Sequence, residues 1–76
     1  MKTKETEMGV FVLIMGTQYI ESNEYIDTVA GVFSTRERAE KMGNFLVKAT
    51  EVEPFTDDKE NKIIYLNYEV ENFIVL

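Results

Sequence analysis

The stretch GVFSTRERAEK, residues 31–41, decides the fold, because an apolar strand ends in it and a helix begins. Ser34 is a favourable N-cap residue, and Glu37 follows three positions later, as in a capping box. We expect the Ser34 hydroxyl to accept from the Glu37 backbone N–H, and the Glu37 carboxylate to accept from the Ser34 N–H. The junction therefore predicts strands before residue 34 and a helix after it.

Two segments before this junction alternate as β-strands do. The first, residues 8–15, is apolar on both faces, which is typical of a central strand that is covered on both sides. One face carries Val10, Val12 and Ile14, and the other Phe11, Leu13 and Met15. The second is residues 25–33, where Gly31 indicates a bulge. One helix covers only one face of a small sheet, so we expect a second copy of the chain on the other.

The helix is expected over residues 35–50, and Gly43 indicates that it packs closely on the sheet. Its apolar stripe is Ala39, Met42, Leu46 and Ala49, with Phe45 alongside. Pro54 ends the helical pattern, and residues 51–61 form a predicted loop.

A third strand is predicted over residues 62–71, after that loop. Its core face carries Ile64, Leu66, Tyr68 and Val70. The apolar tail, residues 73–76, is expected to form a short edge strand or to pack on a partner. The whole pattern predicts an α+β fold of order ββαβ(β): a three- to four-stranded, mostly antiparallel sheet with one helix on one face. Residues 1–7 are expected to be flexible, and residues 8–76 to form a single domain.

The composition limits the function. The chain has 76 residues, a net charge of −6, and neither cysteine nor histidine. Without these two residue types, disulfides, common zinc sites and the usual nucleophiles and general bases are missing, so we expect a non-enzymatic protein with no cofactor and no metal. The acidic charge opposes direct nucleic-acid binding. The longest apolar run, residues 10–15, is too short to cross a membrane, and we expect a cytoplasmic protein without a signal peptide.

Acidic side chains form the first candidate site, a surface for a basic protein partner. They are Glu53, Asp57, Asp58, Glu60, Glu69 and Glu71. Residues 35–50 carry four basic and two acidic side chains, so the negative charge is concentrated elsewhere. A calcium loop does not fit the 51–61 segment, because Lys59 stands where a ligand is needed and no glycine follows.

Apolar and tyrosine side chains form the second candidate site, an interface for a homodimer or another partner. They are Phe11, Leu13, Met15, Ile63 and Tyr65. Ordinary packing in the core is the alternative interpretation of these residues.

The chain resembles small phage and bacterial domains in which an apolar strand leads to a segment like residues 31–35. A helix containing Ala39 and Glu40 and a closing strand like residues 68–71 follow in those domains. The resemblance covers most of residues 9–71, implies the same fold and a phage or prophage setting, and brings no binding or catalytic residues.

We therefore expect a small acidic protein-binding domain. In a phage it would inhibit a host defence protein or a nucleic-acid-binding protein by occupying its basic site. An accessory or regulatory module without an inhibitory role, and a small-ligand sensor with a pocket at a dimer interface, are the alternatives.

Overall fold

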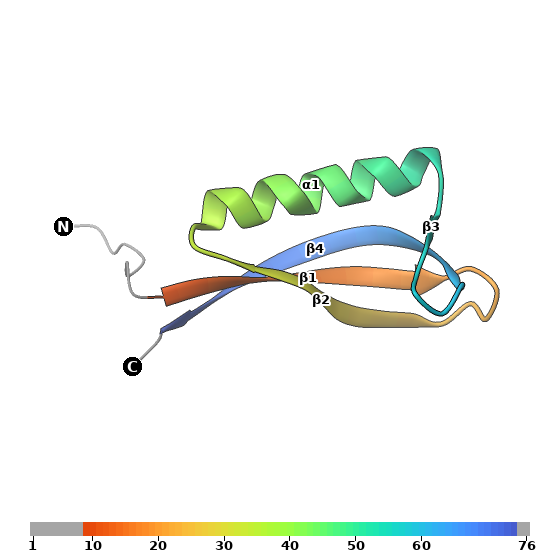
Figure 1. Cartoon of the computed structure of the whole chain (residues 1–76), viewed down its shortest axis with the longest axis horizontal. Helices are drawn as coiled ribbons and strands as arrows, with labels where there is room; N and C mark the ends of the chain where they lie inside the picture. The colour runs from red at the N-terminus through yellow and green to blue at the C-terminus, as the bar shows by residue number, and fades with distance from the viewer. Residues whose placement is uncertain (1–8, 75–76) are drawn as a thin grey trace.

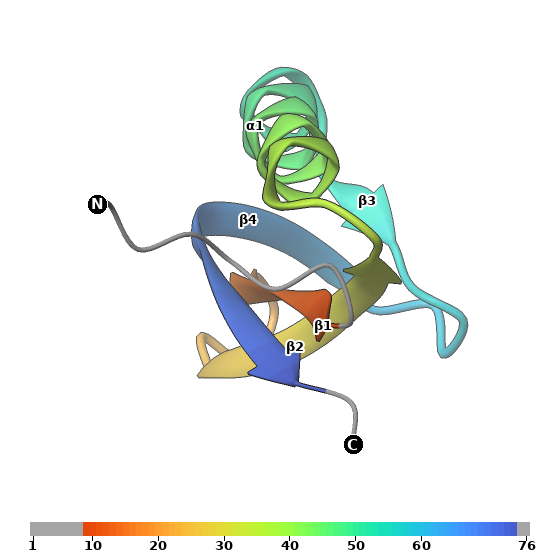
Figure 2. The same cartoon turned by 90° about the vertical axis from the view of Figure 1, so that its left-hand side faces the viewer.

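The computed structural model describes residues 9–74, which form one antiparallel sheet and one helix (Figure 1). The elements are β1 (Gly9–Tyr19), β2 (Tyr25–Phe33), α1 (Arg36–Val52), β3 (Phe55–Thr56) and β4 (Lys62–Ile74). The strand order is β2-β1-β4-β3, and α1 covers one face of the curled sheet (Figure 2). The predicted α+β class and ββαβ(β) order are thus confirmed. The predictions for residues 1–8 and 75–76 fall outside the described residues, and Phe73 and Ile74 continue β4 instead of forming a separate edge strand.

The central strand is β1, as its two apolar faces predict. It pairs with β2 along one edge and with β4 along the other, where Gly9 lies opposite Ile74 and Tyr19 opposite Ile63. It runs four residues beyond its predicted end at Met15. The bounds of β2 are those predicted, whereas β3 arises inside the predicted 51–61 loop.

The core lies between β1 and α1. Leu13 and Met15 are completely buried, Phe11 is nearly so, and Ala39 of α1 packs on them. Burial of each large apolar side chain contributes roughly 1.5–3 kcal/mol to folding. Our prediction that these β1 side chains lie on an uncovered face is therefore wrong, because the helix covers that face.

The other two predicted interface residues, Ile63 and Tyr65, also belong to the helix side of the sheet. Ile63 is buried, and Tyr65 is partly buried against the core. The error arises from a β-bulge at Leu66, which has no partner because Gly16 faces Asn67 while Thr17 faces Tyr65. A bulge shifts the alternation by one residue, so the two halves of β4 obey different patterns.

The inward face of α1 also differs from the predicted stripe. Its buried residues are Ala39, Gly43 and Thr50, while Met42 and Phe45 are exposed. Gly43 lies over the Tyr68 ring, where an added Cβ would come within 2.6–2.8 Å of ring carbons. The predicted close packing at Gly43 is thus confirmed, and this contact sets which side of α1 meets the sheet.

The helix begins one residue later than the predicted capping box requires. Thr35 is the N-cap, and its Oγ1 accepts from the Arg38 backbone N–H at 3.2 Å. The Ser34–Glu37 capping box is therefore wrong. Thr35 has the extended conformation of an N-cap, with φ −137° and ψ 152°.

Side chains of α1 bind the outer edge of β4, which β3 covers only at Lys62 and Ile63. Thr50 Oγ1 accepts from the Tyr65 backbone N–H at 2.9 Å, and the Arg36 guanidinium donates to the Val70 carbonyl at 3.4 Å. These contacts satisfy backbone groups that would otherwise attract another strand. Along the outer edge of β2, no described element pairs with the strand.

Candidate protein-binding face

The sheet face opposite α1 is uncovered in the described part of the chain. We call it the open face, and its centre is three cross-strand rows, one through each of Val12, Ile14 and Gly16 of β1. The rows are Val32–Val12–Glu71, Val29–Ile14–Glu69 and Asp27–Gly16–Asn67. Each row takes its first residue from β2 and its last from β4, so directly opposed side chains share this face.

Apolar side chains fill one side of the open face. Val29 and Val32 on β2 are 66% and 61% exposed, while Val12 and Ile14 on β1 are partly buried between their neighbours. Exposed apolar residues that lie next to one another are typical of interaction surfaces. The β2 half of the face therefore offers apolar contact area.

Carboxylates lie across the same face. The pKa of Glu69 is raised above its usual value, first by a hydrogen bond with Glu71 and by the Glu71 charge, then by desolvation and by the Asp27 charge. Like charges at short range disfavour ionisation, so these three groups repel one another when all are ionised. Among the described residues, no lysine or arginine forms an ion pair with them.

One end of the open face is closed by a polar bridge. The Tyr25 hydroxyl donates to the Asn67 amide oxygen at 3.4 Å, above Gly16. A Cβ at position 16 would collide with both groups. Glycine is therefore required at this position if the bridge is to cross β1.

The predicted acidic surface divides into two separate parts. Glu69 and Glu71 lie on the open face, whereas Glu53, Asp57, Asp58 and Glu60 belong to the turn region near the end of α1. Glu69 lies seven positions beyond Lys62 along β4, a span of about 23 Å. The two groups of carboxylates therefore cannot act as one small site.

Within the turn, Asp57 has a structural role. Its Oδ1 accepts from the backbone N–H groups of Lys59 at 3.0 Å and Asn61 at 2.8 Å, as in an Asx turn. Glu60 has a φ of 67°, in the left-handed region. Glu53, Asp58 and Glu60 are exposed, so they are the members of this group whose side chains remain available to a partner.

Asp27, Gly16 and Asn67 are open-face residues that the sequence prediction missed. Alternation alone places Asp27 on one face of its strand, but it does not show that this face is the one that carries Glu69. The missing information is the register across β1, which depends on the bulges at Ala30 and Leu66.

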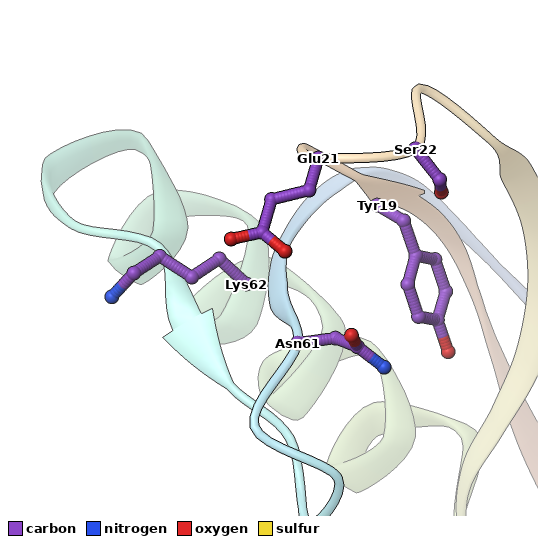
Figure 3. Close-up of a pocket in the computed structure, with 5 residues that line it drawn as sticks. All are labelled: Tyr19, Glu21, Ser22, Asn61 and Lys62. Atoms are coloured by element: carbon purple, nitrogen blue, oxygen red, sulfur yellow. The ribbon is translucent and has the colours of Figure 1, made fainter.

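A small hollow lies where the β1–β2 turn meets the start of β4 (Figure 3). Its lining residues are Tyr19, Glu21, Ser22, Asn61 and Lys62, and its volume is about 90 Å³. Pockets for small molecules usually have volumes of roughly 300–1,000 Å³. The hollow therefore does not provide a site for a metabolite.

Within residues 9–74, no group of acidic side chains is arranged to hold a metal ion, and α1 lacks the length and apolar composition of a membrane-spanning helix. No protein-family model, curated protein or solved structure matches this chain.

Proposed function

We propose that this chain is a small, non-enzymatic protein-binding domain that docks a partner on its open face. The observation that supports this most is the combination of exposed valines with three carboxylates that form no ion pair with a lysine or arginine of residues 9–74. A partner that brings lysine or arginine to Asp27, Glu69 and Glu71 would relieve their repulsion, and its apolar side chains would cover Val29 and Val32.

The charge of the face favours a different protein over a second copy. Two copies stacked face to face would place both sets of carboxylates in one interface, and like charges within an interface are costly. We therefore propose a cationic partner rather than the homodimer expected from the sequence.

A finer proposal concerns the partner's activity. Cationic, partly apolar protein surfaces often bind nucleic acid. A chain with a net charge of −6 would compete with nucleic acid for such a surface. In a phage setting, as the sequence resemblance implies, this competition would inhibit a host defence or nucleic-acid-binding protein.

The test is a titration of the isotope-labelled chain with a short peptide of alternating lysine and valine, followed by NMR. We expect the amide signals of Val12, Ile14 and Val29 to shift. The double variant Glu69→Lys/Glu71→Lys should bind about tenfold more weakly or worse. Binding should also weaken as the salt concentration rises.

The matched control is Asp58→Lys/Glu60→Lys, which changes the net charge equally but on the 53–61 turn. Asp57 is left unchanged because it holds that turn together. Equal losses in both double variants would mean that only net charge matters, and the open face would then be rejected as the site.

A second candidate function is favoured by the free edge of β2. An accessory module could accept a partner's strand there through backbone hydrogen bonds. In the same titration, signal shifts confined to residues 25–33, with no effect of the Glu69 and Glu71 substitutions, would support strand addition instead.

A further inference from the structure

A groove lies beside α1, on the sheet face opposite the open face. Phe33 of β2 lines one side of it, and Arg38, Lys41, Met42 and Phe45 of α1 line the other. Its volume is about 370 Å³, in the range of sites that hold ligands or side chains of partners. Because none of these five residues belongs to the open face, the groove is a separate surface.

The position of α1 on the sheet explains the groove. The helix packs mainly on β4, less on β1 and least on β2. Figure 2 shows α1 above the β4 side of the curled sheet. On the helix side of the sheet, the part formed by β2 is therefore only partly covered. A second helix alongside α1 would cover the rest of this side.

The helix residues that line the groove are apolar and accessible. Phe45 is 63% exposed and Met42 is 39% exposed. Aromatic residues, methionine and arginine are the residue types enriched at protein interfaces. Covering Met42 and Phe45 would remove apolar surface from water, which favours association.

The charge of the groove is opposite to that of the whole chain. Arg38 and Lys41 flank the apolar side chains, although the net charge of the chain is −6. The Lys41 ammonium lies 3.8 Å from the Glu37 carboxylate, but both side chains are more than three-quarters exposed, so this pair is weak. An acidic partner is therefore attracted to this groove rather than to the rest of the surface.

The spacing of the lining residues indicates the shape of the occupant. Positions 38, 41, 42 and 45 form a single i, i+3, i+4, i+7 stripe along α1. Such a stripe can pack against one face of a neighbouring helix. We propose that the groove binds an acidic amphipathic helix of a partner protein, with its apolar side chains on Met42 and Phe45 and its carboxylates at Arg38 and Lys41.

A second copy of this chain fits less well. Two α1 helices related by a two-fold axis at this stripe would bring the Arg38 and Lys41 side chains of both copies to one interface. That arrangement places like charges together, whereas an acidic helix neutralises them.

The experiment is a selection of displayed random peptides on the full chain, followed by affinity measurements with the synthesised winners. We expect acidic peptides with apolar residues three and four positions apart. Their dissociation constant should rise about tenfold or more for Arg38→Glu/Lys41→Glu. Replacing their carboxylates by lysines should reverse the preference between wild type and this variant.

The matched control is Lys59→Glu/Lys62→Glu, which reverses the same number of exposed charges outside α1 and outside the groove lining. It should leave the affinity within about twofold. The substituted side chains are all exposed, and circular dichroism will verify that the variants are folded. The variant Glu69→Lys/Glu71→Lys separates the two surfaces, because it should not weaken the acidic peptides.

Three results would overturn the proposal. Acidic peptides that bind Arg38→Glu/Lys41→Glu as tightly as wild type would place the site elsewhere. Enrichment of basic peptides alone would refute the groove while still supporting the open face. A wild-type dimer in light scattering that Arg38→Glu/Lys41→Glu dissociates would make the occupant a second copy.

Discussion

Thr35 is the residue that starts α1, and its cap can be tested against its neighbour Ser34. Thr35→Ala removes the acceptor of the Arg38 N–H, so it should lower the free energy of unfolding by about 1 kcal/mol. Ser34→Ala, the matched control, should change it by less than about 0.5 kcal/mol. Urea unfolding of both variants measures the difference. A larger loss for Ser34→Ala would restore the capping box predicted from the sequence.

The same pair of residues shows how far a local sequence signal reaches. Adjacent Ser34 and Thr35 both carry a hydroxyl suited to an N-cap, and Glu37 favours Ser34. The choice between them depends on where the chain leaves β2, and Phe33 is held there by pairing with Phe11. The sequence therefore locates the helix start to within one residue, and the sheet selects the cap.

At the scale of elements, Gly43 is the contact that brings α1 onto β4. Alanine is normally the better helix former by about 1 kcal/mol. Here Gly43→Ala should instead destabilise the fold by roughly 1–3 kcal/mol, because the new methyl group would overlap the Tyr68 ring. Thermal unfolding monitored by circular dichroism gives the sign of the change.

A double-mutant cycle provides the control for this contact. Tyr68→Leu replaces the flat ring, so Gly43→Ala should cost less in that background than in the wild type. If the two substitutions have additive effects, the Gly43–Tyr68 contact does not determine how the helix packs.

The strands illustrate why the fold is predictable from the sequence and the composition of the open face is not. Alternation and length correctly identify β1, β2 and β4, because two-residue periodicity is local. The bulges at Ala30 and Leu66 leave no pattern in the sequence. Beyond each bulge, the residues that alternation assigns to one face of the sheet lie on the other face. Alternation therefore predicts the wrong side for Ile63 and Tyr65, whereas it predicts the side of Glu69 and Glu71, beyond the bulge, correctly.

At the scale of the whole molecule, the repelling carboxylates make stability depend on pH. The folded chain holds the pKa of Glu69 above its unfolded value of about 4.3. Between the unfolded and the raised folded pKa of Glu69, the folded state therefore binds more protons than the unfolded state. The free energy of unfolding falls as pH rises through this range. Glu69→Gln should raise the melting temperature at pH 7, and the gain should disappear below about pH 4.

The control for this effect is Glu40→Gln, which removes an exposed carboxylate from α1 and changes the net charge equally. Glu40→Gln should raise the melting temperature at pH 7 by less than Glu69→Gln does. Equal gains for both variants would attribute the pH dependence to the overall negative charge rather than to the open face.

The pairing of β1 with β4 also determines how the domain responds to mechanical force. Gly9 lies opposite Ile74, so both ends of the described chain leave the sheet at the same end of one antiparallel ladder. A pulling force applied to these two residues breaks the cross-strand hydrogen bonds one after another instead of all together. The domain should therefore yield at low tension, and an unfolding machine that pulls these ends apart would first separate the strand pair that supports Phe11 and Leu13.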